Sequence, residues 1–329
     1  MPTEMLPLPE FALLRPGSVD ECVALLAEHP DAKLVSGGTD LIPSMKYGIF
    51  APDTVVSTAH IAALRGITAT ADGGVSIGAG ATLWDVRHHP DVVARYPTLS
   101  AACATIATPT IQAMGTLGGN VMLDTRCTWY NQSTFWRRSL GGCLKCEGDI
   151  CWVAPKGGGC YAANSADTVP VLQLLDASVT LQSADGSRSV PLSDFYDEDG
   201  RTWHTARPGE LLTRIALPPP PRAWLAHRKL RPRGAIDYPL LLTAVRVDVD
   251  VDDRPIGGRV VVSALGPKPL EIAGAADALA RGDTAAVADL AWKQAFPLST
   301  HTWPSLWRKK MVRVEVRRAL ADALGDTAG

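Results

Sequence analysis

The 329-residue chain lacks several features that mark special classes of protein. It has no run of about 18 apolar residues, so we expect no membrane span. Its first residues, MPTEMLPLPE, lack a basic segment followed by an apolar run, so we expect no signal peptide and a cytoplasmic location. A net charge of only −2 gives no indication of a nucleic-acid partner. Internal repeats are also missing, and what remains is a globular protein long enough for two domains.

Sequence patterns in the first 220 residues predict short helices and strands. Ser18 and Glu21 have the spacing of a capping box, and apolar residues follow at helical spacing, so a helix is expected over about 18–30. Further predicted elements are strands at 33–35 and 75–77, a helix beginning at Thr82, a helix over 98–107, and ordered structure at 169–175 and 179–181.

The segment ALPPPP at 216–221 predicts a domain boundary, because four consecutive prolines favour an extended linker. Beyond it, apolar runs at 240–249 and 259–265 predict an antiparallel hairpin. Helices are predicted over about 270–281, 284–294 and 304–324. Strands followed by helices indicate a smaller α+β domain over 221–329. The last helix carries basic residues that we expect on a solvated face or, as the alternative, at a subunit contact: Arg308, Lys309, Lys310, Arg313, Arg317 and Arg318.

Three glycine turns lie at the ends of predicted elements: SGGTDL (36–41), IGAGATL (77–83) and TLGGN (116–120). Glycine lets backbone N–H groups approach a phosphate closely, and a helix N-terminus favours negative charge. None of the turns matches G-x-G-x-x-G, so a Rossmann fingerprint is absent. The residues alone leave two interpretations open, simple tight turns and a dinucleotide site.

In this order the three turns resemble the flavin-binding subunit or domain of the xanthine dehydrogenase family of molybdenum hydroxylases. The stretches FALLRPGSVDECVALLAE (11–28) and KLRPRGAIDYPLLLTAV (229–245) resemble that family too, so the resemblance covers essentially the whole chain. It implies an α+β fold. A two-subdomain FAD-binding domain of the vanillyl-alcohol-oxidase type would occupy 1–220, and the smaller C-terminal domain would follow.

The resemblance also implies where FAD binds. The first and third turns would embrace its diphosphate, Asp167 would bond its ribityl or ribose hydroxyls, and Lys229 would approach the isoalloxazine ring. Arg233 and Asp237 match the family less well at that ring. A cation there would stabilise reduced, anionic flavin. The implied FAD residues are Leu34, Val35, Ser36, Gly37, Gly38, Thr39, Asp40, Leu41, Ala107, Thr116, Gly118, Gly119, Asn120, Asp124, Asp167 and Lys229.

Five of the seven cysteines lie in one loop, 122–162, which has no helical or strand period. Disulfides are rare in a reducing cytoplasm, so these cysteines are first interpreted as metal or cluster ligands. Only Cys143 and Cys146 are close-paired, which fits neither a bacterial ferredoxin nor a zinc ribbon. From the residues alone, zinc, an iron–sulfur cluster and buried thiols stay open. Nearby cations would favour thiolates: Arg126, Arg137, Arg138 and Lys145.

Aromatic residues in the same loop have two open interpretations. Trp129, Tyr130, Phe135 and Trp136 either cover a cluster against water or simply pack the loop. The remaining cysteines, Cys22 and Cys103, occupy apolar helical positions and are expected in the core.

The loop resembles an insertion in the medium subunit of 4-hydroxybenzoyl-CoA reductase, which carries a [4Fe–4S] cluster there. The match rests on DTRCTWYNQS (124–133) and on the surroundings of the later cysteines. It implies Cys127, Cys143, Cys151 and Cys160 as the cluster ligands, and it leaves Cys146 without a counterpart.

Together these resemblances imply an electron-transfer subunit of a molybdenum enzyme. The implied partners are a molybdopterin-binding large subunit and a small subunit with two [2Fe–2S] clusters, in a dimer of heterotrimers. A ferredoxin would supply electrons for reductive dehydroxylation of an aromatic acyl-CoA. The alternatives are an oxidative molybdenum hydroxylase, a flavoprotein whose loop is held by zinc or disulfides, and, with less support, a self-sufficient oxidase of the vanillyl-alcohol type.

Overall fold

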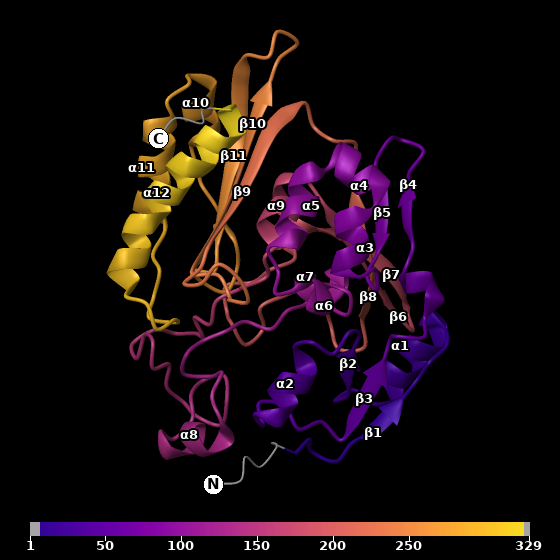
Figure 1. Ribbon diagram of the computed structural model, residues 1–329. Helices are drawn as coiled ribbons and strands as arrows, with labels where there is room; N and C mark the ends of the chain where they lie inside the picture. Colours follow the sequence, from indigo (N-terminus) through magenta and orange to yellow (C-terminus); the bar gives the residue numbers. More distant parts are fainter. Residues whose placement is uncertain (1–6, 326–329) are drawn as a thin grey trace.

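The computed structural model describes residues 7–325, which form three β-sheets with helices packed against them (Figure 1). The first sheet is small and parallel, in the order β1 (Ala12–Leu14), β3 (Thr54–Ser57), β2 (Lys33–Val35). Parallel strands need a crossover, which α1 (Val19–Glu28) provides between β1 and β2. The Ser18 hydroxyl accepts a hydrogen bond from the backbone N–H of Glu21 at 3.1 Å, which confirms the predicted start of this helix.

The second sheet is antiparallel and supports most of the N-terminal part. Its order is β4 (Ile67–Ala69), β5 (Val75–Gly78), β8 (Leu211–Leu217), β6 (Ser178–Ser183), β7 (Gly186–Pro191). Short helices pack on it: α3 (Leu83–His88), α4 (Pro90–Arg95), α5 (Pro97–Ala104), α6 (Pro109–Gln112), α7 (Leu117–Val121) and α9 (Val169–Leu174). Ile77, Leu99 and Leu172 are fully buried in the core between them.

The third sheet is antiparallel, in the order β12 (Leu270–Glu271), β11 (Pro255–Ser263), β10 (Leu241–Val249), β9 (Ala223–Leu230). This order confirms the predicted hairpin. Helices α10 (Ala275–Ala280), α11 (Thr284–Gln294) and α12 (Ser305–Leu324) cover the outer face of the sheet, and α9 lies on its other side (Figure 1). The mixture of helices and antiparallel sheets confirms the α+β class.

Two local predictions in the C-terminal part are wrong. The helix expected from 270 begins at Ala275, because Leu270 and Glu271 pair with β11 as strand β12. Arg308 does not lie on a solvated face, since it is only 1% exposed. Its guanidinium donates hydrogen bonds to the carbonyl oxygens of Leu240, Leu298 and Ala264, so the start of α12 is anchored by a buried cation that satisfies backbone acceptors.

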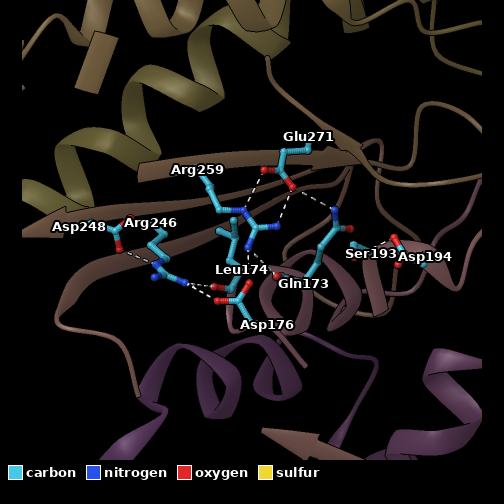
Figure 2. Close-up of polar contacts among 9 residues, drawn as sticks. All are labelled: Gln173, Leu174, Asp176, Ser193, Asp194, Arg246, Asp248, Arg259 and Glu271. Carbon is cyan, nitrogen blue, oxygen red and sulfur yellow. Dashed lines mark hydrogen bonds and ion pairs between the residues drawn. The ribbon is translucent and has the colours of Figure 1, made fainter. Parts of the chain in front are cut away.

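A cluster of charged side chains joins α9 to the third sheet (Figure 2). Arg259 of β11 donates to Asp176 at 2.5 Å and to Glu271 at 2.6 Å. Arg246 of β10 donates to the same Asp176 at 2.8 Å and to the carbonyl oxygen of Leu174 at 2.9 Å. Two cations from neighbouring strands therefore share one carboxylate at the end of α9, which fixes the C-terminal sheet against the N-terminal part.

The cysteine loop, 122–162, extends from the lower end of the molecule and contains the short helix α8 (Thr134–Ser139) (Figure 1). One link to the C-terminal part is a backbone hydrogen bond from Thr128 to Thr300 at 2.9 Å. Over residues 7–325, none of the helices is long and apolar enough to cross a membrane.

Candidate cofactor sites

A cavity of about 550 Å³ opens where the first two sheets meet the third. This volume is within the usual range for a small-molecule or cofactor site. Every residue predicted to contact FAD lines it: Leu34, Val35, Ser36, Gly37, Gly38, Thr39, Asp40, Leu41, Ala107, Thr116, Gly118, Gly119, Asn120, Asp124, Asp167 and Lys229. Sequence positions almost 200 residues apart thus share one cavity.

The three glycine turns pack against one another through their backbones. A Cβ at Gly37 would lie 1.8 Å from the carbonyl oxygen of Met114, and one at Gly118 would lie 2.6 Å from the carbonyl oxygen of Ala79. Neither position has room for a side chain. Gly38 also has a φ of +71°, a left-handed conformation that glycine adopts without strain. The close approach leaves an open cradle of backbone beside the cavity, which fits a bulky anionic group such as a diphosphate.

The polar groups of the third turn are held by local hydrogen bonds. Thr116 caps α7 by accepting from the backbone N–H of Gly119 at 3.0 Å. The side-chain oxygen of Asn120 accepts from the hydroxyl of Thr168 at 2.6 Å and from its N–H at 3.2 Å. The turn is therefore tied directly to the segment that carries Asp167.

A buried ion pair faces the cavity from two different parts of the chain. Lys229 of β9 and Asp167 lie 2.7 Å apart, and their side chains are 3% and 7% exposed. Lys229 also donates to the carbonyl oxygen of Thr105 at 3.2 Å. Burial raises the pKa of Asp167 to about 6, and the Lys229 ammonium opposes that rise. Asp167 keeps acceptor capacity toward the cavity, and Lys229 supplies the positive charge.

Of the two weaker candidates for the isoalloxazine ring, the structure places only one at the cavity wall. Asp237 lines the cavity, whereas Arg233 does not and is largely exposed. The two bind each other at 2.8 Å. The cavity also contains residues that sequence reasoning missed, among them Trp203 and Tyr238. The Tyr238 ring lies under the guanidinium of Arg126 at 3.8 Å, and Arg126 pairs with Asp40. No local motif marks Trp203, and Tyr238 lies in the family-like stretch 229–245 without having been singled out.

Four cysteines of the loop line a second, small cavity. Cys127, Cys143, Cys151 and Cys160 all contribute to it and are each no more than 8% exposed. Cys146 is half-buried and is not part of the lining. All seven cysteines are free thiols, and burial raises the pKa of Cys127 to about 12. These are the four cysteines expected as ligands. Cys22 and Cys103 are fully buried in apolar clusters, which confirms their predicted core role.

The cations and aromatic residues of the loop divide into different roles. Of the four cations expected to favour thiolates, only Lys145 lines the small cavity. Arg137 is buried but donates to the carbonyl oxygens of Gln132 and Gly48. Among the aromatic residues, Trp129 and Tyr130 line the cavity together with Trp152, and Trp129 stacks on Trp152 at 5.9 Å. Phe135 is 85% exposed, so it does not cover the cysteines.

The cysteines do not form a site for a single ion. Within residues 7–325, no three His, Cys, Asp or Glu side chains are grouped closely enough to hold one metal ion. The described arrangement therefore gives no support to a bound metal ion of any kind, and every cysteine of the loop is a free thiol.

Comparison with known proteins agrees with this geometry. Residues 9–220 match the family described as the FAD binding domain in molybdopterin dehydrogenase. The aldehyde oxidoreductase FAD-binding subunit PaoB of Escherichia coli K12 is 32% identical over 310 residues, covering 91% of this chain and 95% of that one. The carbon monoxide dehydrogenase medium chain of Afipia carboxidovorans is 29% identical over 325 residues, covering 95% of this chain and 96% of that one.

A solved structure shows the same fold. The reconstituted CO dehydrogenase from Oligotropha carboxidovorans includes a chain that superposes with a TM-score of 0.79 at 26% identity, covering 96% of this chain and 98% of that one. The family match and these relatives define the chain as an FAD-binding oxidoreductase subunit. The chain belongs to the FAD-binding subunits of the molybdopterin dehydrogenases, the group that includes the xanthine dehydrogenase and CO dehydrogenase flavoproteins. A particular closeness to 4-hydroxybenzoyl-CoA reductase is not shown by these relatives.

Proposed function

We propose that this chain is the electron-transfer subunit of a molybdenum enzyme and holds both FAD and a [4Fe–4S] cluster. The observation that carries the proposal is the convergence of four buried, free thiols of one loop on a single cavity. Four thiolates are the ligand set of such a cluster. Residues 1–220, with the loop 122–162 inserted, would hold the cofactors, and residues 221–329 would form the C-terminal domain.

The residues of the large cavity suit the parts of FAD in turn. The glycine cradle around Gly37 and Gly118 would hold the diphosphate, and Asp167 would accept hydrogen bonds from the ribityl or ribose hydroxyls. Lys229 would place its positive charge near the isoalloxazine ring, where it would stabilise the reduced, anionic form. Bound FAD exchanges one or two electrons and therefore suits an intermediate position in a relay.

The four cysteines share one cavity but are not grouped for a single ion, which favours a cluster over zinc. Four sulfurs around one tetrahedral zinc would each lie about 2.3 Å from the metal and so close to one another. In a [4Fe–4S] cluster each cysteine binds a different iron, so the sulfurs are spread more widely. A shared cavity whose cysteines are not grouped for one ion agrees with the second arrangement.

For the direction of electron flow we favour an oxidative enzyme. The relatives named above include an aldehyde oxidoreductase subunit and a carbon monoxide dehydrogenase chain. The complex would oxidise a small substrate at molybdenum, and this subunit would carry the electrons away. A reductive role like that of 4-hydroxybenzoyl-CoA reductase, with a ferredoxin as donor and an aromatic acyl-CoA as substrate, is the second candidate. The resemblance of the loop DTRCTWYNQS favours it.

The proposed partners are a molybdopterin-binding large subunit and a small subunit with two [2Fe–2S] clusters, assembled in the cytoplasm as a dimer of heterotrimers. Affinity purification through a tag on this chain, without oxygen, tests the assembly. Native mass spectrometry should give three different chains in equal numbers, and the complex should contain molybdenum. Recovery of this chain alone, or of a complex without molybdenum, would contradict the proposal.

The same complex distinguishes the two directions. Stopped-flow mixing with a panel of aldehydes should bleach the flavin absorbance within the turnover time if the enzyme is oxidative. If only reduced ferredoxin bleaches it, and an aromatic acyl-CoA then restores the colour, the reductive role is correct.

A further inference from the structure

Lys145 lies between the two cofactor cavities. It lines the cysteine cavity, and its side chain is only 6% exposed. Its ammonium lies 4.9 Å from the ring centroid of Tyr130, which also lines the cysteine cavity. It lies equally far, 4.9 Å, from the ring centroid of Trp203, which lines the FAD cavity. One buried cation is therefore in contact with the walls of both sites.

The partner of the Lys145 ammonium is Asp124, which lies at the FAD cavity. The Lys145 ammonium donates to the carboxylate of Asp124 at 2.6 Å, and the Asp124 side chain is 14% exposed. Asp124 lines the FAD cavity and not the cysteine cavity. The ion pair thus has a direction, with its positive end at the thiols and its negative end at the flavin site.

Neighbouring acceptors hold the Lys145–Asp124 pair in this orientation. Lys145 also donates to the carbonyl oxygen of Gly200 at 2.7 Å and to the hydroxyl of Thr125, so its position is fixed by several acceptors. Because the pair is shielded from water, salt screens it far less than a surface pair.

We propose that the Lys145–Asp124 ion pair sets the difference in redox potential between the two cofactors. The inference rests on the proposed function, since it needs both FAD and the cluster. One electron added to the cluster makes it one charge more negative, and the nearby ammonium stabilises that state and raises the cluster potential. The carboxylate beside the flavin site destabilises reduced, anionic flavin and lowers its potential. The pair therefore favours electron movement from FAD to the cluster.

The test is the double variant Lys145→Met/Asp124→Asn. It removes both charges at nearly constant shape and leaves no unpaired charge in the interior, which a single variant would do at a cost in stability. The potentials are measured on the anaerobically purified holoprotein by redox titration, the cluster by electron paramagnetic resonance and the flavin by visible absorbance. We expect opposite shifts, with the cluster potential lower and the flavin potential higher. Each should change its reduction constant about tenfold, which is 59 mV for one electron.

A matched control is available in the same loop. Arg138 and Glu147 form an exposed pair at 3.7 Å, with side chains 70% and 66% exposed. Arg138→Met/Glu147→Gln should leave both potentials unchanged, because water screens an exposed pair. Shifts of the same sign in the buried-pair variant, or none, would overturn the inference and leave Lys145 as a structural link between Thr125 and Gly200.

Two further measurements distinguish a failure of this inference from a failure of the proposed function. If the double variant loses its cofactors, Asp124→Asn alone serves, because Lys145 keeps its other acceptors. It should raise both potentials, the flavin potential by more, and equal or absent shifts would contradict the inference. If the wild-type chain itself contains no iron, the proposed function fails instead.

Discussion

The ammonium of Lys229 lies 2.7 Å from the carboxylate of Asp167, although one residue is on the C-terminal sheet and the other precedes α9 in the N-terminal part. Both side chains are buried at the wall of the large cavity. The cavity that we propose for FAD is therefore completed only when the two parts of the chain are packed together. This makes the site sensitive to the charge of the pair and to the interface that positions it.

The charge of Asp167 gives the first prediction. Its pKa of about 6 lies above its usual value of 3.8, so between about pH 4 and 6 the folded apoprotein binds more protons here than the unfolded chain. Its contribution to stability is full below pH 4 and is lost as the pH rises through 6. The stability advantage of wild type over Asp167→Asn should therefore shrink by up to about 3 kcal/mol between pH 4 and 7, at about 1.4 kcal/mol per pKa unit.

Urea unfolding of the apoproteins at several pH values measures this difference. Taking the difference between two chains removes the contribution of His227, which runs in the opposite direction because burial lowers its pKa to about 4. A difference that stays constant across the range would mean that Asp167 titrates alike in the folded and unfolded chains.

The glycine cradle gives the second prediction. In Gly37→Ala the new methyl group would collide with the backbone of Met114, 1.8 Å away, and force the first and third turns apart. Overpacking of this kind costs about 1–3 kcal/mol, so FAD should bind about tenfold more weakly. Gly66→Ala is the control, because nothing lies within 4 Å of its Cβ position. Isothermal titration of the apoproteins with FAD measures both, and equal affinities would exclude a role for this close packing.

The cysteine loop offers a matched pair of variants. Cys127 lines the small cavity and Cys146 does not, although both are loop cysteines. Cys127→Ser should lose most of the iron and of the acid-labile sulfide, because the cluster needs four thiolate ligands, while FAD stays bound. Cys146→Ser should keep both cofactors. If iron falls equally in the two variants, the ligand set is wrong.

The charged cluster of Figure 2 gives a prediction for stability. Arg259→Met removes the hydrogen bonds to Asp176 and Glu271 and leaves two partly exposed carboxylates without that partner. We expect a loss of about 1–2 kcal/mol in the free energy of unfolding, since two partly exposed ion pairs contribute up to about 1 kcal/mol each. Arg254→Met, at a residue 77% exposed, should change stability by less than about 0.5 kcal/mol. Thermal unfolding compares the two, and equal effects would contradict a role for the cluster.

Much of the fold could be predicted from local sequence. The hydroxyls of Ser18 and Thr82 begin helices because a cap needs only a side-chain oxygen and a nearby N–H, both visible at short range. The hairpin of β10 and β11 followed from apolar runs around a turn. The buried Arg308 was missed because its acceptors are carbonyl oxygens from three distant segments, and no helical pattern records them.

The candidate sites show the same difference between residues marked by a local motif and residues placed by long-range contacts. The glycine turns were visible as motifs, and the family resemblance added Asp167 and Lys229. Trp203 was not found because it reaches the cavity from a segment without a motif, and Tyr238 was not found although it lies in the family-like stretch 229–245, because its position beside the cavity depends on long-range packing. Lys145 was expected only to favour thiolates, and its contact with Asp124 becomes visible only when the loop is folded against the FAD cavity.

The most direct test of the central claim is the content of iron, acid-labile sulfide, zinc and FAD per chain in protein purified without oxygen. A [4Fe–4S] cluster on Cys127, Cys143, Cys151 and Cys160 predicts about four iron and about four sulfide per chain, one FAD and no zinc. FAD accompanied by zinc, or by no metal, would contradict the account. The loop would then be a structural insertion in an ordinary FAD subunit.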